Sequence, residues 1–301
     1  YSHEWQGEYV WYRPDLMRSH RQTARPGEPE RFEREKILLS RMAEKLTASF
    51  DSGNFYIKDA FLIASIDTGV SLKYLLSTIN SKLINFWYIS TFTTVDTHRN
   101  EVMRLPIRRI SFTTPAEERA RLGAELQDLY AQEKYEEILA AVQECLPQDE
   151  AGGFIAERER SDVVHDLLAF LAERMLEMNK EKQQEIRVYQ GWLEGYLGAK
   201  VEDLSLKTKV QGYYEHDYES LLAVLKKNRK KLAVDPARRE PGETLKAEFE
   251  GSMKKLGPLR ERIRQTDGLI DAVVYRLYGL TEEEIGIVEG RSEMSECENI
   301  R

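Results

Sequence analysis

The 301-residue chain carries 44 Lys and Arg against 52 Asp and Glu, and its net charge of −8 argues against a uniformly basic nucleic-acid binder. Its two cysteines, Cys145 and Cys297, are too few for a disulfide framework or a cysteine zinc site, as expected in a reducing cytoplasm. No apolar run approaches the ~20 residues of a membrane span, so we expect no membrane partner. The chain begins YSHEWQGEYV, without Met or a signal-peptide pattern, and we therefore expect a piece of a longer cytoplasmic protein.

Residues 1–110 are predicted to form a β-rich domain. Aromatic and β-branched runs such as GEYVWY, GNFYI and DAFLIASI alternate with turn residues, which is typical of short strands. The stretch RFEREKILLSRMAEKL is interpreted as a strand or helix followed by a basic turn. A helix is predicted over 71–90, because apolar residues from Leu72 to Trp87 recur at three-and-four spacing and Ser71 stands at the N-cap.

Beyond residue 110 the sequence predicts helices. A charged helix over 115–145 and a linker over 146–153 lead to one helix of roughly 40 residues over 157–196. Further helices are predicted over 218–232, 243–256, 259–278 and 281–289, the last from the capping-box spacing of Thr281 and Glu284.

The expected fold class is therefore α+β: a small mixed β-sheet followed by long, mostly antiparallel helices. The expected domains are a β-rich domain over 1–110 with its helix 71–90, a connecting helix and linker over 111–153, and a helical region over 154–301.

Several catalytic motifs are absent. No two prolines are adjacent, which excludes the Asn-Pro-Pro-aromatic element of amino-methyltransferases, and neither G-x-G nor [DE]-x-K occurs. We expect no methyltransferase or nuclease chemistry, and no cofactor, in this chain alone. Asp162, His165 and Asp166 share a predicted helix face that could hold a metal ion, but no second cluster completes a coordination shell, so hydrogen bonding is the preferred interpretation and no metal is expected.

Two segments resemble the TaqI-like C-terminal specificity domain. That family carries a Leu-x-Asn-Ser-x-Leu helix and then a Leu-Pro-Ile strand, and the matching positions are Ile79, Asn80, Ser81 and Leu83, then Leu105, Pro106 and Ile107. Upstream, EKILLSRM is similar to the family's Lys-Ile-Leu strand and basic turn through Lys36, Ile37, Leu38 and Arg41.

The C-terminal segments, including SDVVHDLLAFLAERMLEMNKEKQQE, resemble those of type IIG restriction-modification enzymes and of BREX-type adenine-specific DNA methyltransferases. The resemblance implies a target-recognition domain with helical supports. Its N-terminal adenine-N6 methyltransferase, which would bind S-adenosylmethionine, and any endonuclease would be missing from this chain. The partners would be double-stranded DNA and those missing catalytic domains, and the helix with Asn80 and Ser81 would be a scaffold packed on the recognition sheet.

The loop STFTTVDTHRNEVMR offers side chains that bind base edges in the major groove. The base-reading candidates are Thr94, His98, Arg99 and Asn100, although an ordinary solvated hairpin loop would have a similar composition. Arg and Lys bind phosphates. The phosphate candidates are Arg41, then Arg104 and Arg108 at the end of this loop, Arg13, Arg18 and Arg21 in an N-terminal basic stretch that also contains Arg25, and Lys226, Lys227, Arg229 and Lys230 in KKNRKK.

Each basic stretch also has a simpler interpretation. The N-terminal stretch is either a DNA-contacting arm or a linker, and the cations of KKNRKK would stabilise a helix C-terminus without any DNA. At the level of the whole chain, two hypotheses remain: a DNA-specificity module of a restriction-modification enzyme, or a helical protein-interaction scaffold of a phage-defence complex without base readout.

Overall fold

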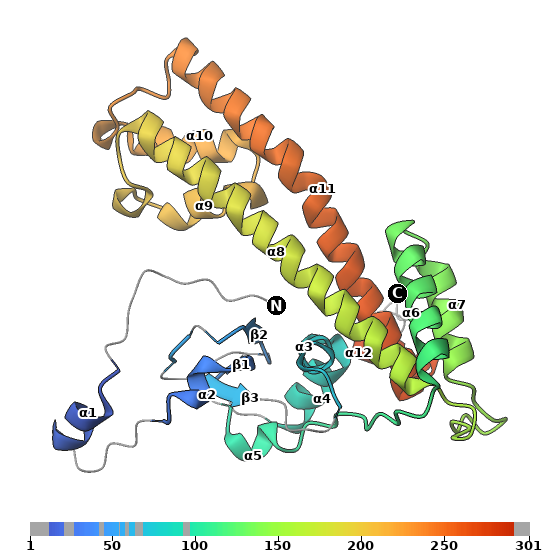
Figure 1. The fold of residues 1–301 in the computed structure, drawn as a ribbon. Helices are drawn as coiled ribbons and strands as arrows, with labels where there is room; N and C mark the ends of the chain where they lie inside the picture. Colours follow the sequence, from blue (N-terminus) through green and yellow to red (C-terminus); the bar gives the residue numbers. More distant parts are fainter. Residues whose placement is uncertain are drawn as a thin grey trace, which may run out of the picture. The chain divides into compact units, whose positions relative to one another are not determined.

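The computed structural model describes residues 12–20, 27–41, 45–53, 55–57, 60–63, 69–92 and 97–291. The chain divides into two compact units: unit 1 comprises 1–176 with 266–301, and unit 2 comprises 177–265. This grouping differs from the expected division at residues 110 and 153. The reason is that two long helices, α8 (Ser161–Leu197) and α11 (Arg239–Tyr278), each contribute one end to unit 1 and the other end to unit 2 (Figure 1).

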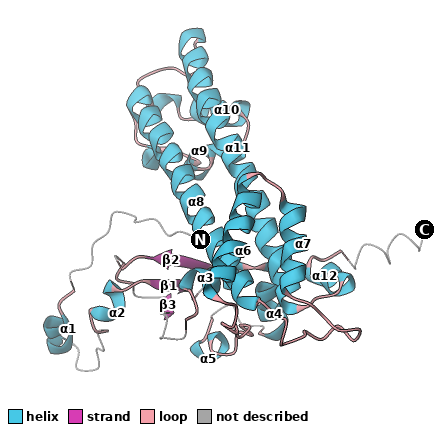
Figure 2. Cartoon of the chain, turned by 45° about the vertical axis from the view of Figure 1, so that its right-hand side comes forward, coloured by secondary structure: helices cyan, strands magenta, loops and turns pink. Residues whose placement is uncertain are grey.

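Unit 1 contains a three-stranded sheet of β1 (Lys36–Ser40), β2 (Ala48–Asp51) and β3 (Ala60–Ile63) in the order β2-β1-β3 (Figure 2). Its central strand β1 is buried from Lys36 to Leu39, which accounts for the unbroken Ile-Leu-Leu run. The α+β class is confirmed. Both pairings among the described strands are antiparallel, whereas a mixed sheet was expected.

A buried ion pair joins β1 to β2. The Lys36 ammonium contacts the Asp51 carboxylate, and both side chains are essentially inaccessible to solvent. The same carboxylate accepts backbone N–H groups of Gly53 and Phe55, each at 3.1 Å. These bonds satisfy a charge that would otherwise be costly to bury, and they fix the turn that leaves β2.

The helix expected over 71–90 is two helices, α3 (Leu72–Asn80) and α4 (Lys82–Thr91), because Ser81 adopts an extended conformation and its hydroxyl caps α4. The Asn80 side chain bonds both backbone groups of Ala48, accepting from its N–H (2.9 Å) and donating to its carbonyl (3.0 Å). Asn80 thus completes hydrogen bonds of strand β2, which stands at the sheet edge. The expected scaffold role of this helix fits these contacts.

No strand forms at Leu105–Pro106–Ile107. This extended segment is instead held by Tyr278 at the end of α11, whose hydroxyl donates to the Pro106 carbonyl (2.7 Å) and accepts the Arg108 N–H (3.0 Å). Because Pro106 lacks an N–H, a strand ladder there would be incomplete. The Tyr74 hydroxyl also donates to the Arg108 carbonyl (3.2 Å), so two tyrosines from α3 and α11 hold this segment.

The helix expected over 115–145 is a hairpin of α6 (Ala116–Ala131) and α7 (Tyr135–Cys145). Glu133 has a positive φ of 59°, and the Lys134 N–H returns to the Leu129 carbonyl (3.0 Å), which ends α6. The last helix, α12 (Glu282–Val288), begins at the capping box that Thr281 and Glu284 predicted.

Smaller helices complete unit 1: α1 (Pro14–His20) and α2 (Glu30–Glu33) precede the sheet, and α5 (Arg99–Val102) follows α4. The Phe32 ring of α2 stacks on Tyr56 with centroids 4.7 Å apart. Across the part of the chain that the structure describes, no helix has both the length and the apolar character needed to cross a membrane.

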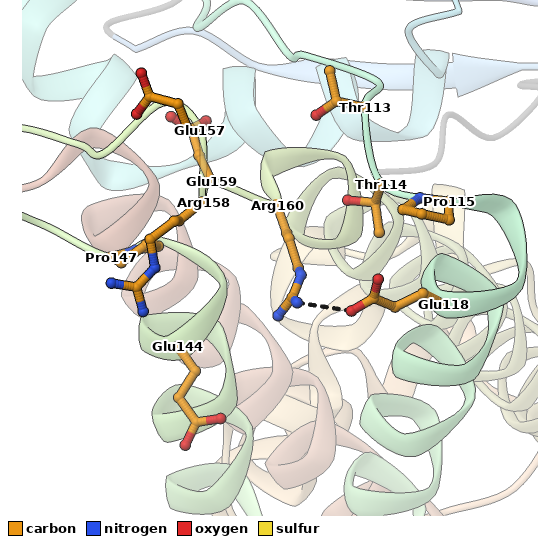
Figure 3. Close-up of a pocket in the computed structure, with 10 residues that line it drawn as sticks. All are labelled: Thr113, Thr114, Pro115, Glu118, Glu144, Pro147, Glu157, Arg158, Glu159 and Arg160. Atoms are coloured by element: carbon orange, nitrogen blue, oxygen red, sulfur yellow. Dashed lines mark ion pairs between the residues drawn. The ribbon is translucent and has the colours of Figure 1, made fainter.

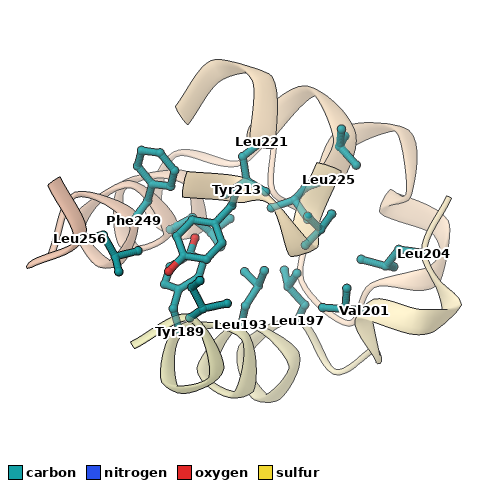
Figure 4. Packing of buried hydrophobic residues seen from close by; sticks show 14 residues of the cluster. Tyr189, Leu193, Leu197, Val201, Leu204, Tyr213, Leu221, Leu225, Phe249 and Leu256 are labelled. Atoms are coloured by element: carbon teal, nitrogen blue, oxygen red, sulfur yellow. The ribbon is translucent and has the colours of Figure 1, made fainter. Parts of the chain in front are cut away.

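Unit 2 is built on the C-terminal part of α8 and the N-terminal part of α11, with η1 (Val201–Asp203), α9 (Lys207–Gln211), η2 (Tyr213–Glu215), α10 (Tyr218–Lys227) and η3 (Arg229–Lys231) between them. Its core holds Tyr213 against Tyr189 with ring centroids 4.1 Å apart (Figure 4). The two helices expected over 243–256 and 259–278 are continuous in α11 despite Pro258, because the buried Leu256 in the preceding turn belongs to this core and its packing offsets the missing hydrogen bond.

Candidate nucleic-acid interface

A buried hydrogen-bond network lies under the one-turn helix α5. The Tyr88 hydroxyl of α4 donates to the Glu101 carboxylate (2.9 Å) and lies 3.1 Å from the Thr97 hydroxyl, and all three side chains are buried. Glu101 also accepts the N–H of His98 (2.9 Å), while the N–H of Thr97 donates to the carbonyl of Arg41 after β1 (2.8 Å). The turn 97–101 is therefore fixed to both the sheet and α4.

Three consecutive side chains project from this fixed turn. His98, Arg99 and Asn100 are all exposed, while Glu101 on the opposite side of the turn is buried. Arg104, two residues beyond α5, is exposed and its guanidinium carbon lies 5.3 Å from the centre of the Phe92 ring. Imidazole, guanidinium and amide groups on one rigid turn form a hydrogen-bonding surface suited to base edges and phosphates.

Three of the four base-reading candidates lie together in the structure, and the fourth lies outside the described residues. His98, Arg99 and Asn100 come together on α5, and Thr94 lies outside the described residues. Glu101 is not among the residues predicted from the sequence, although it stands three residues after His98 at capping-box spacing, which indicates a helix start that would support this surface.

Among the phosphate candidates of the first half, Arg13 and Arg18 are exposed at α1, and Arg13 pairs with Asp15. That hydrogen bond lowers the pKa of Asp15 to about 2. Arg41 is partly buried directly after β1, and Arg21 and Arg25 lie outside the described residues.

Arg108 differs from the expectation of a phosphate contact. Its guanidinium donates to the Leu277 carbonyl near the end of α11 and to Glu159 (3.0 Å), and it lies 4.0 Å from the centre of the Phe154 ring. A cation is stabilised at the carbonyl end of a helix, and these partners leave the guanidinium directed at protein groups. Arg108 is a structural residue, whereas the neighbouring Arg109 is exposed.

The basic run KKNRKK lies in unit 2 at the end of α10, where Lys226 and Lys227 form the last turn. Lys226, Lys227, Arg229 and Lys230 are exposed, while Asn228 is buried and bonds both backbone groups of Ser205 (2.8 and 3.0 Å). The position of Lys226 and Lys227 at a helix C-terminus accords with the simpler interpretation of the run, which requires no ligand.

His165 is fully used in hydrogen bonding. Its Nε2 accepts the backbone N–H of Ser71 (2.9 Å), and its Nδ1 lies 2.9 Å from Asp166, which also receives two bonds from Arg119 (both 2.6 Å). Asp162 accepts the N–H and hydroxyl of Thr114 (2.9 and 2.6 Å). Because Nε2 accepts a backbone N–H, it has no lone pair for a metal ion or for activating a hydroxyl.

A cavity of about 370 Å³ lies in unit 1, with a lining that contains no residue of α5 (Figure 3). Its lining contains four glutamates and two arginines, Arg158 and Arg160, and Arg160 pairs with Glu118 at 2.7 Å. The glutamates of the lining are Glu118, Glu144, Glu157 and Glu159. Two of these glutamates are neutralised, since Glu118 pairs with Arg160 and Glu159 with Arg108, and the remaining excess of carboxylates disfavours a phosphate ligand.

Comparisons with known proteins identify a family over the part of the chain that contains α5. Residues 1–109 match the family described as the TaqI-like C-terminal specificity domain, which confirms the resemblance over this part of the chain and supports a DNA-recognition module of a restriction-modification enzyme. Residues 161–274 match a domain of unknown function, DUF8810. No curated protein and no solved structure matches the chain.

Proposed function

We propose that this chain recognises a specific sequence in duplex DNA on behalf of an adenine-N6 methyltransferase, with or without an endonuclease activity, of the type IIG or BREX kind. The proposal is supported by three exposed side chains, His98, Arg99 and Asn100, which lie above a buried hydrogen-bond network. All three belong to the segment that matches a specificity domain. Rigid positioning matters because base readout depends on hydrogen bonds of fixed direction.

In this proposal the chain performs no methyl transfer or cleavage itself. An adenine methyltransferase flips its target base out of the duplex, so a partner domain must hold the flanking DNA and read the neighbouring bases. S-adenosylmethionine would bind the methyltransferase domain rather than this chain. The expected partners are duplex DNA and those catalytic domains, and the expected setting is a cytoplasmic phage-defence system.

The test is selection of bound sequences from a random duplex library, combined with fluorescence anisotropy at two salt concentrations. Arg99→Ala should relax the base preference at one or two positions, with a loss of about 1–3 kcal/mol against the preferred sequence. Arg104→Ala should weaken binding to all sequences and make the salt slope shallower by about 1, as expected for a lost phosphate contact.

Arg121→Ala is a matched control, because Arg121 is an exposed arginine of unit 1 that pairs with Glu125 on α6 (2.5 Å). Its binding should equal that of the unaltered chain. A random library that yields no preferred sequence, with equal binding by all three variants, would contradict base readout by α5 and favour the scaffold hypothesis.

A further inference from the structure

Two cations of unit 2 meet at one aromatic ring. Tyr214 of η2 has the Lys182 ammonium of α8 at 5.7 Å and the Arg260 guanidinium carbon of α11 at 5.4 Å from its ring centre. Arg260 also donates to the Tyr214 carbonyl. Three elements from separate parts of the sequence therefore place two positive charges together, each within cation–π range of the ring.

Neither cation has a carboxylate partner within ion-pair distance among the residues that the structure describes. Two neighbouring acidic side chains pair with other cations: Glu185 with Lys255 (2.9 Å) and Glu261 with Arg264 (2.5 Å). Glu215, next to Tyr214, is the nearby carboxylate that acts on Lys182, but it forms no ion pair with either cation. Burial and the charge of Arg260 lower the pKa of Lys182, and Glu215 opposes this shift only in part. The two positive charges are thus incompletely neutralised by the protein.

Like charges held together destabilise a fold unless another group compensates for them. Both flexible side chains could reach solvent separately, yet they converge on Tyr214. The surrounding residues favour an anion as the missing group: residues 177–265 hold 19 Lys and Arg against 15 Asp and Glu, although the whole chain has a net charge of −8. An arginine fork beside an ammonium group is a common arrangement for phosphate oxygens.

We infer that Lys182, Tyr214 and Arg260 form a phosphate-binding site for the backbone of duplex DNA. The site is independent of sequence, because the cations cover the ring on which a base would otherwise stack. Its phosphate chemistry follows from the cluster itself, whereas the choice of duplex DNA as the source of the phosphate rests on the proposed function.

The experiment measures anisotropy of a fluorescein-labelled duplex of random sequence with the whole 301-residue chain over a range of salt concentrations. The double variant Lys182→Gln/Arg260→Gln should make the log–log salt slope shallower by about 2, because each lost phosphate contact contributes about 0.9. The matched control is Lys200→Gln/Arg239→Gln, which removes two exposed cations of unit 2 that pair with Glu194 (2.9 Å) and Glu243 (2.8 Å). The control should keep the slope of the unaltered chain.

A second readout needs no variant. Acetylation of the unaltered chain, followed by mass spectrometry, should show Lys182 protected severalfold by the duplex while Lys200 keeps its reactivity. An unchanged slope relative to the control, or equal reactivity of Lys182 with and without the duplex, would overturn the site.

The same assays separate this site from the α5 surface. Loss of slope in a chain that shows no sequence preference would refute the proposed function and leave the phosphate site standing. An intact sequence preference with an unchanged salt slope in the double variant would support the proposed function and refute the phosphate site.

Discussion

Replacing Lys36 by Met should strongly destabilise the sheet of unit 1. The substitution removes the ammonium group but keeps a long apolar stem, so it leaves the Asp51 carboxylate charged and buried without its cation. Breaking a buried ion pair on one side typically costs about 3–5 kcal/mol. We expect the lower end, about 3 kcal/mol, because Asp51 keeps the backbone N–H groups of Gly53 and Phe55.

The suitable assay is hydrogen exchange of the β1 amides, resolved by mass spectrometry, since β1 is the central strand and should exchange only when the sheet opens. A loss of about 3 kcal/mol corresponds to roughly 150-fold faster exchange. Lys73→Met is the matched control: Lys73 pairs with Glu173 at 2.7 Å, but the two side chains are 31% and 45% exposed. The control should therefore cost about 0–1 kcal/mol. Equal exchange rates in the two variants would refute the argument that burial makes the Lys36–Asp51 pair structurally essential.

Two further predictions follow from the contacts of unit 1. Tyr88→Phe removes a hydrogen-bond donor to the Glu101 carboxylate, which should cost about 1.5–3 kcal/mol of stability. The preference for one DNA sequence should then weaken while the salt slope of binding stays the same. A changed slope with an intact preference would contradict a positioning role for Tyr88. Burial raises the pKa of Asp271 to about 6, although the Lys82 backbone N–H donates to it. The folded state therefore binds this proton more tightly than the unfolded chain does, and stability should rise by about 1 kcal/mol between pH 7 and pH 5 in urea unfolding, a gain that Asp271→Asn should abolish. A gain of equal size in Asp271→Asn would assign it to another group.

Much of the candidate surface could be located from sequence. Arg99 and Asn100 stood out because polar side chains without apolar periodicity follow a strongly amphipathic segment, and the specificity-domain match covers them. The sequence did not identify Tyr88 and Glu101 as the buried side chains that support this surface. Tyr88 occupies a position that fits any helix core, and the capping-box spacing of Glu101 becomes informative only once a helix start at His98 is known.

The α+β class, the long helix α8 and the capped start of α12 can all be predicted from the sequence, because apolar periodicity and capping are local properties of the chain. Which charged side chains bind other parts of the protein becomes clear only from the folded arrangement. Arg108 binds the end of α11, 169 residues away, and Lys182 and Arg260, 78 positions apart in sequence, lie at the same Tyr214 ring, whereas His98, Arg99 and Asn100 remain exposed. The physical reason is that the environment of a charge depends on which distant segments pack around it, and the spacing of residues along the chain does not specify those contacts.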